Sequence, residues 1–399
     1  MIINFFSIVL VALLFISASF YGVLTIPLPT QDIILLLSLV TLVIYLKEFK
    51  SKTLHEDRNF YYFFLYAFIM SLFMAYLNFG QPIVYSMRVA RLLIVYAVLL
   101  IALNVLLQNF DIKKAYPFMI FVSFIIIAIN FYVYITGDIS FLVEEVGVLK
   151  RLGEIRITIG TFTSIIFIFY FYHKLKENKA FIIPLLGLLL TMVVVSKTRS
   201  VLFPILIIML IPLLRAHKAQ VFKVWMVLGG IVLLSFIFLG YEKSILSPIL
   251  DLFSLLVEES QTVKNSNVNI RGLELVYFWN FLDIKSMIFG YGMENIQFKE
   301  LYASHFYLSD IGLFKIFYYH GVIGFSLYIF MYWRLYKVSK KQDTALHFTG
   351  RAIVYFQILS PSNIFLYTTE YMFLFFVVYI LVKNSNKKMQ SILNLKEKI

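Results

Sequence analysis

Positively charged residues stand in several short polar turns between apolar stretches of the sequence. Arg88 and Arg91 precede one apolar stretch, Lys197 and Arg199 share a four-residue turn, and Arg271 lies in the longest polar interval. A guanidinium group is permanently charged and forks onto phosphate oxygens, so arginines that converge on one cavity could hold a diphosphate. Each arginine could instead extend to lipid head groups, and that alternative stays open at this point.

Further along the same polar interval, His305 stands close to Tyr307 and Asp310. An imidazole can accept the proton of an alcohol nucleophile, which makes His305 a candidate general base. A purely structural, hydrogen-bonding histidine fits the same residues. His320 differs because it lies in an apolar stretch beside Gly321, where we expect it to pack inside a helix.

The element Gly290-Tyr291-Gly292 predicts a tight turn or a close approach of the backbone to a neighbour. The sequence has no Gly-Lys-Ser/Thr P-loop, no His-Glu-x-x-His pair and no Gly-x-Ser-x-Gly elbow, which disfavours metal hydrolysis and serine acyl transfer. Because cysteine is absent, thiol catalysis and cysteine metal sites are excluded. We therefore expect neither a metal nor a cofactor.

Composition assigns the chain to the membrane proteins. Of its 399 residues, 61% are hydrophobic and 14% charged, whereas a soluble domain is about half apolar and about a quarter charged. The net charge of +13 resides largely in short loops between apolar segments. That distribution indicates that the loops are anchored at an anionic membrane surface, so we expect membrane lipid as a partner. It does not indicate binding to nucleic acid.

The sequence predicts an all-α polytopic membrane protein with about twelve transmembrane helices, since a span needs about 20 apolar residues. The expected spans are residues 2–24, 32–46, 60–77, 92–107, 115–136, 157–172, 181–196, 201–214, 221–240, 313–333, 352–366 and 370–382. The first has no basic residue before it, so we expect an uncleaved span; a cleaved signal peptide is the alternative.

The distribution of basic residues predicts the orientation. With the N-terminus in the cytoplasm, the loops on that side hold 21 of the 35 lysines and arginines. The positive-inside rule then places both termini in the cytoplasm and residues 241–312 outside. Apolar residues in this interval recur at helical spacing, which predicts a cap of short amphipathic helices on the outer membrane surface. We expect residues 1–399 to form a single integral membrane domain, with the cap loop 241–312 inside it.

The order of several short motifs resembles one family. They are Arg199 in its outward turn, Arg271 at the start of a cap helix, Phe289-Gly290-Tyr291-Gly292, His305-Phe306-Tyr307-Leu308 and Gly321-Val322-Ile323-Gly324. Together with the topology, this order resembles the O-antigen polymerase (Wzy-type) and O-antigen ligase superfamily, whose fold is GT-C-like. The family often has Asn directly after the histidine, where this chain has Phe306, and that raises Asp310 as a partner or substitute for His305.

The resemblance implies a metal-independent glycosyltransferase in the bacterial cytoplasmic membrane, with its active site on the extracytoplasmic face. Its donor and acceptor would be undecaprenyl-diphosphate-linked oligosaccharides, and a chain-length regulator is an implied partner. Arg199 and Arg271 would stabilise the departing diphosphate, and His305 or Asp310 would act as base. Supporting contacts would come from further residues: Lys197, Arg88 and Arg91 for the diphosphate, and Tyr291, Glu294 and Tyr307 for the glycan.

Two other functions fit parts of the same pattern. A ligase that transfers finished glycan to a lipid core or to protein would share all these residues. A flippase or transporter for lipid-linked oligosaccharides would suit twelve spans, but it is expected to carry charged residues inside the spans, where this sequence has almost none. A non-catalytic assembly partner is a third possibility.

Overall fold

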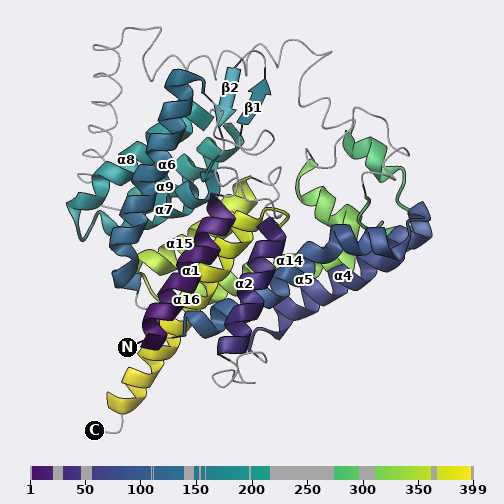
Figure 1. The fold of residues 1–399 in the computed structure, drawn as a ribbon, viewed down its shortest axis with the longest axis horizontal. Helices are drawn as coiled ribbons and strands as arrows, with labels where there is room; N and C mark the ends of the chain where they lie inside the picture. The colour runs from purple at the N-terminus through teal and green to yellow at the C-terminus, as the bar shows by residue number, and fades with distance from the viewer. Residues whose placement is uncertain are drawn as a thin grey trace.

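The computed structural model describes residues 2–20, 30–45, 56–108, 110, 112–138, 148–151, 154–157, 159–196, 199–215, 274–295, 311–360 and 366–396. This part of the chain is mainly helical (Figure 1). In chain order its elements are α1 (Ile2–Ser19), α2 (Thr30–Ile44), α4 (Arg58–Phe79), α5 (Ile83–Leu106), η2 (Ile112–Ala115), α6 (Tyr116–Thr136), β1 (Val148–Arg151), β2 (Glu154–Ile157), α7 (Thr161–Lys174), η3 (Lys179–Phe181), α8 (Ile182–Leu190), the π-helical turn η4 (Thr191–Ser196), α9 (Arg199–Arg215), α13 (Ile284–Phe289), α14 (Leu313–Ser339), α15 (Ala345–Leu359) and α16 (Thr369–Lys396).

The described helices are those of a helical membrane protein. Four segments are long and apolar enough to cross a bilayer: Arg58–Phe79, Ile83–Leu106, Ile112–Thr136 and Leu313–Ser339. The described residues therefore do not establish the predicted twelve spans. Most of the other expected spans coincide with helices such as α7, α8 and α15, which are shorter than the roughly 20 residues a bilayer requires. The expected span 221–240 and most of the expected cap lie outside the described residues.

The prediction of an all-α fold needs one small correction. Val148–Arg151 and Glu154–Ile157, which precede α7 in the chain, pair as an antiparallel two-stranded sheet. Charged and apolar residues alternate along Glu154–Ile157, a pattern that fits a strand better than a helix. Arg151 and Arg156, which precede an expected span, are therefore strand residues.

The longest helical pair is the antiparallel hairpin of α4 and α5. Gly80 ends α4 in the left-handed conformation (φ 62°), where its amide donates to the carbonyls of Ala75 and Tyr76. This is a common way for a helix to end, because glycine adopts positive φ without a side-chain clash. Pro82 then precedes the first turn of α5 in an extended conformation, so three residues reverse the chain.

Aromatic side chains fill the interior between α4, α5 and α16. Phe60 lies 4.7 Å from Tyr379 between ring centroids, and Phe64 lies 5.9 Å from both Tyr96 and Phe376. All five rings are buried. Edge-to-face and tilted contacts of this kind fix the helices relative to one another.

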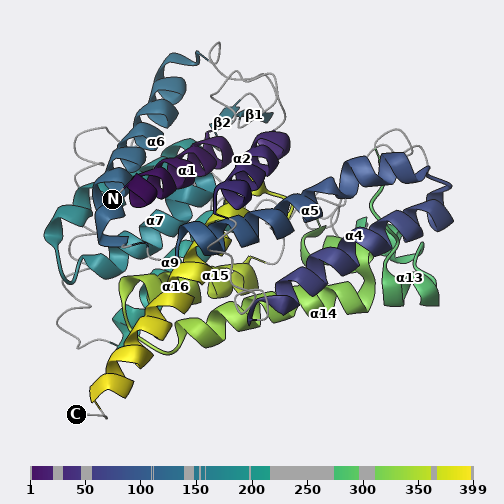
Figure 2. The same cartoon turned by 60° about the horizontal axis from the view of Figure 1, so that its bottom comes forward.

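The remaining helices arrange themselves around this core. In Figure 1, α4, α5, α14 and α13 form the right-hand part of the molecule, α6 to α9 the left-hand part, and α1, α15 and α16 lie between them. The view of Figure 2 shows α14 running alongside the hairpin of α4 and α5, with α13 beside its far end. The start of α1 and the end of α16 lie at the same end of the molecule (Figure 1).

Candidate functional site

Three glycines bring α4, α13 and α14 into backbone contact at one point. A Cβ atom on Gly290 would lie 2.2 Å from the carbonyl oxygen of Tyr319, and one on Gly292 would lie 2.4 Å from the amide nitrogen of Ala75. A Cβ on Gly321 would lie 2.3 Å from the carbonyl oxygen of Ile288. All three residues have positive φ. The predicted close approach at Gly290 and Gly292 is therefore confirmed, and we call this contact the glycine crossing.

A break in α14 supplies the hydrogen bonds of the glycine crossing. Gly321 has non-helical dihedral angles (φ 65°, ψ −172°) in the middle of the helix. The amide of Tyr291 donates to the carbonyl of Tyr318 at 2.6 Å, and the amide of Gly292 donates to that of Tyr319 at 3.2 Å. A kink deprives carbonyls one turn earlier of their helical donors, so the Gly290–Gly292 segment takes the place of the missing turn.

Gln81, in the turn between α4 and α5, holds the chain that follows the glycine crossing. Its side-chain oxygen accepts from the amide of Asn295 at 2.8 Å, and its side-chain nitrogen donates to the carbonyl of Met293 at 3.3 Å. Gln81 is fully buried. These bonds fix the backbone on both sides of Glu294, a residue predicted to bind glycan.

Polar side chains gather around Glu294 and His320, and we call this set the outer cluster. The hydroxyl of Tyr319 donates to Glu294 at 3.5 Å, and the ammonium group of Lys315 lies over the rings of Tyr319 and Tyr367, at 5.6 and 4.8 Å from their centroids. Behind them, His320 Nε2 lies 3.0 Å from the hydroxyl of Tyr367. The cluster consists of Ser71, Glu294, Lys315, Tyr319, His320 and Tyr367.

His320 is buried, as predicted, but it is more than a packing residue. Its Nδ1 lies 3.5 Å from the hydroxyl of Ser71, and the hydroxyl of Tyr66 donates to its carbonyl at 3.3 Å. The ring also meets that of Phe63 edge to face. These contacts tie the break in α14 to α4 and to Tyr367, a connection that the sequence position beside Gly321 did not reveal.

Tyr291 is positioned by packing on both α4 and α14. Its ring stacks on Tyr318 at 5.1 Å and meets the edge of Phe79 at 5.0 Å, and its carbonyl accepts from the side chain of Asn78 at 2.9 Å. Partial burial raises the pKa of the Tyr291 phenol, and the charges of Asp283 and Glu294 add to that effect. Tyr291 remains half-buried, so its exposed edge lies close to Glu294 in sequence and in space.

The two arginines of α5 lie inside the helix and not before it, because α5 begins at Ile83. Arg91 forms an ion pair with Asp32 of α2 at 3.2 Å and donates to Gln31 at 3.2 Å. Its charge is therefore engaged in holding α2 against α5. Arg88 is exposed on the same helix. A diphosphate role for Arg91 would require it to leave Asp32.

Of the other predicted site residues, the structure describes only the backbone of Arg199. Lys197, Arg271, His305, Tyr307 and Asp310 lie outside the described residues. For Arg199 the backbone is described: it is the first residue of α9.

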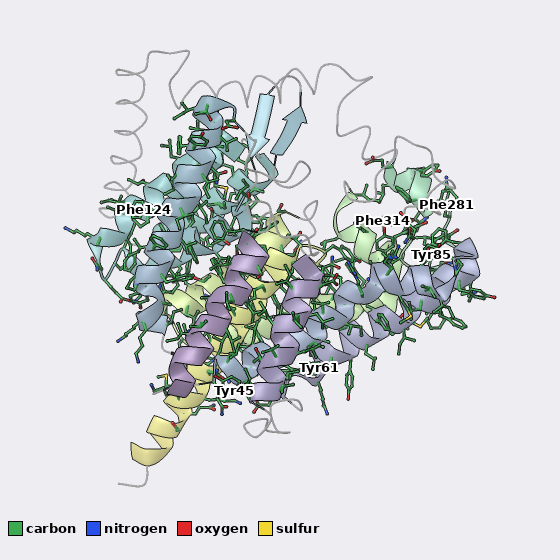
Figure 3. The ribbon with its side chains drawn as sticks, in the orientation of Figure 1. Tyr45, Tyr61, Tyr85, Phe124, Phe281 and Phe314 are labelled. Atoms are coloured by element: carbon green, nitrogen blue, oxygen red, sulfur yellow. The ribbon has the colours of Figure 1, made fainter. Side chains whose placement is uncertain are left out.

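The described segments that follow Arg271 and Asp310 pack against each other. Residues 274–279, which follow Arg271, form a helical turn that packs on the start of α14, which follows Asp310. Trp279 stacks on Phe317 at 6.1 Å and an interplanar angle of 13°, and Phe278 meets Tyr318 at 5.5 Å. Figure 3 shows the labelled side chains of Phe281 and Phe314 at this end of the molecule, near Tyr85.

Sequence reasoning missed a buried ion pair between the start of α4 and the middle of α16. Lys383 donates to Asp57 at 2.6 Å and to Asn104 at 2.8 Å, while Tyr379 donates to Asp57 at 2.8 Å. Asp57 and Tyr379 are completely buried, and Lys383 is 6% exposed. We call these four residues the inner cluster. Both charged residues were assigned to loops, but α16 continues well past the expected end of its span.

A second buried carboxylate was also missed. Glu370, in the first turn of α16, accepts from the hydroxyl of Thr163 at 2.6 Å and from its backbone amide at 2.9 Å. The same hydroxyl bonds to Ser19 of α1 at 3.1 Å, so this network joins three helices. Its only signal in the sequence is a single acidic residue at the start of an apolar segment.

The fold and the site together define the class: a helical membrane protein with a polar, aromatic-lined cluster at one end of its longest helices. Within the residues that the structure describes, no group of three or more His, Asp or Glu side chains could hold a metal ion. Comparison with protein-family models and with curated proteins finds no match for this chain.

Proposed function

We propose that this protein is a polysaccharide polymerase of the bacterial cytoplasmic membrane. It would transfer a glycan from undecaprenyl diphosphate to a lipid-linked repeat unit on the extracytoplasmic face, without a metal. The outer cluster carries the proposal: carboxylate, ammonium, imidazole and tyrosine groups meet beside the Gly290–Gly292 element, at the end of α14 where the motif-bearing segment joins it.

We assign the described residues separate roles in binding the glycan. Glu294 and Tyr319 provide an acceptor and a donor for sugar hydroxyls, and the rings of Tyr291 and Tyr367 provide apolar faces of the kind on which sugars pack. Lys315 offers a positive charge at the same place. Arg199 and Arg271 remain the proposed ligands of the diphosphate, and His305 or Asp310 the proposed base, in a topology of about twelve spans with the cap 241–312 outside.

A polymerisation assay tests the proposal. The purified protein in nanodiscs receives a synthetic undecaprenyl-diphosphate repeat unit, without nucleotide sugar or divalent metal, and products are resolved as a gel ladder. We expect a ladder for the wild type and for Lys340→Ala, a control at the opposite end of α14, and none for Arg271→Ala. An unchanged ladder in Arg271→Ala would contradict the assigned role.

The same assay separates the ligase. Transfer of glycan to a lipid core or to a protein acceptor, with no ladder from the repeat unit, would assign that activity instead.

One observation favours a flippase for lipid-linked oligosaccharides more than the sequence did. Buried charged groups are typical of transporters, and the structure buries Asp57, Lys383 and Glu370 among the helices. In all three cases, however, the charge is satisfied by neighbouring protein groups. Movement of the repeat unit across a proteoliposome bilayer, without polymerisation, would establish this alternative.

A further inference from the structure

A large pocket opens at the end of the molecule that holds the inner cluster. Its volume is about 810 Å³, and its walls come from the connection between α5 and α6, the end of α7, the start of α15 and the C-terminal half of α16. Loops predicted to face the cytoplasm therefore meet here. The pocket lies at the opposite end of α4 from the outer cluster, so it is separate from the proposed polymerase site.

Lysines dominate the charged groups of this pocket. Lys113, Lys174, Lys383, Lys387 and Lys388 line it, with Glu177 as the only acidic residue among the lining side chains. Behind the wall, Asp57 pairs with Lys383 and Glu56 pairs with Lys387. Lys174 pairs with Glu177 in the same wall, and Lys113 and Lys388 carry exposed side chains.

Amide and hydroxyl groups complete the polar wall. Asn104, Gln108, Asn384 and Ser385 line the pocket between the lysines. A lysine-rich pocket with several hydrogen-bond donors suits an anion with oxygen acceptors, such as a phosphate group.

A second, entirely apolar pocket of about 110 Å³ continues from the first into the helix bundle. The two share five wall residues: Phe110, Ile112, Tyr170, Leu346 and Leu381. From there the apolar pocket passes between α1, α6, α7 and α16, where Phe15, Phe118 and Val377 line it. A ligand with a charged head and an apolar tail could therefore place its head in the first pocket and its tail in the second.

We propose that these two pockets together bind an anionic phospholipid of the cytoplasmic leaflet. The lysine pocket binds the head-group phosphate, with Lys113 and Lys388 at its mouth, and the apolar pocket receives part of an acyl chain. Basic pockets between transmembrane helices on the cytoplasmic side bind lipid phosphates in this manner. Free phosphate has the chemistry for the lysine pocket but nothing to place in the apolar one.

Lipid titration of the detergent-solubilised full-length protein, read by native mass spectrometry, tests this site. We expect phosphatidylglycerol to bind more tightly than phosphatidylcholine with the same acyl chains. The exchange Lys113→Glu with Lys388→Glu should weaken phosphatidylglycerol binding by roughly tenfold or more, because each basic residue near an anionic head group contributes about 1 kcal/mol. Lys340→Glu with Lys341→Glu, the same charge change outside this pocket, should leave it within about twofold.

The apolar half of the site needs its own variant. Ala115 is half-buried and lines only the apolar pocket. Ala115→Trp should fill that pocket and weaken phosphatidylglycerol binding, while a short water-soluble glycerophosphate should bind it as it binds the wild type. An unchanged melting temperature shows that the variants are folded.

Three results would overturn the proposal. They are equal binding of phosphatidylcholine, unchanged binding after charge reversal at Lys113 and Lys388, and binding of inorganic phosphate with no binding of phosphatidylglycerol. The last would identify the lysine pocket as a site for free phosphate.

Discussion

The inner cluster lies where α4 begins, between α4, α5 and α16, whereas the outer cluster lies further along α4, beside the start of α14. The two clusters differ in the lengths of their polar contacts. In the inner cluster the hydrogen bonds from Lys383 and Tyr379 to Asp57 and Asn104 measure 2.6 to 2.8 Å. In the outer cluster His320 lies 3.0 Å from the hydroxyl of Tyr367, but the contacts of Tyr319 with Glu294 and of Ser71 with His320 both measure 3.5 Å. The inner network is made of short hydrogen bonds between buried groups, whereas the outer cluster combines short and long contacts.

This difference suggests different tasks for the two ends. A buried ion pair whose partners are all satisfied fixes helix positions, and breaking it leaves an uncompensated charge. Polar groups held beside a rigid frame, here the glycine crossing and Gln81, suit ligand binding. We therefore expect substitutions at the inner end to change stability first, and substitutions at the outer end to change activity first.

The largest expected effect on stability is at the inner cluster. Lys383→Met should lower the free energy of unfolding by about 3–5 kcal/mol, because Asp57 would keep a buried charge without its partner. Replacing both partners, as Asp57→Leu with Lys383→Met, should recover most of that loss. Denaturant titration in detergent measures both, and a single-variant loss below about 1 kcal/mol would contradict a structural ion pair.

The glycine crossing should be almost as sensitive. Gly292→Ala combines positive φ with a Cβ 2.4 Å from the backbone of α4, so we expect a loss of roughly 3 kcal/mol. Gly80→Ala is the matched control: its φ is also positive, but no atom lies within 4 Å of its Cβ. It should cost only about 1–2 kcal/mol. Equal losses for the two variants would show that the close approach contributes nothing.

A smaller effect on stability is expected at the outer cluster. Glu294→Gln keeps the shape of the side chain and removes its charge, so the free energy of unfolding should change by less than about 1 kcal/mol. The polymerisation rate should fall by roughly 100-fold if the carboxylate positions the glycan. A full rate in a folded Glu294→Gln protein would remove this residue from the proposed site.

The smallest effect is expected at Asp343, an exposed partner of Arg351 in the loop before α15. Partial burial raises the pKa of this carboxyl, but the hydrogen bond and charge of Arg351 outweigh it and hold the pKa below its ordinary value. Its contribution to stability is thus present above the unfolded pKa and disappears as the pH falls through the lower, folded one. Asp343→Asn should cost only a few tenths of a kcal/mol at neutral pH, since exposed ion pairs contribute little.

A comparison of unfolding free energy at neutral and strongly acidic pH checks the Asp343 prediction. The wild type and Asp343→Asn should differ at neutral pH and converge in acid. A difference that grows with acidification would contradict the sign of the pKa shift.

The sequence predicted the membrane class, the positions of most helices and the close approach at Gly290 and Gly292. Apolar composition and the steric demands of glycine are local properties, which explains this success. It did not predict the break at Gly321, the ion pair of Asp57 with Lys383, or the role of Gln81 in holding Glu294. Each of these depends on residues that lie far apart in the chain and meet only when the helices pack.

The described helices bear out only some of the predicted spans, for a related reason. A pair such as Asp57 and Lys383 neutralises its own charge, so a helix can continue past the point where hydropathy predicts a loop. Short apolar segments such as Ile182–Leu190 form helices too short for a bilayer, although their composition resembles that of a span.

The central claim is that activity depends on the outer cluster and not on the inner one. The most direct test measures the polymer ladder for Glu294→Gln and for the double variant Asp57→Leu with Lys383→Met, both shown to be folded. We predict that the ladder is lost in the first and retained in the second. A normal ladder for Glu294→Gln together with a lost ladder for the folded double variant would contradict the claim and place the functional site at the inner end.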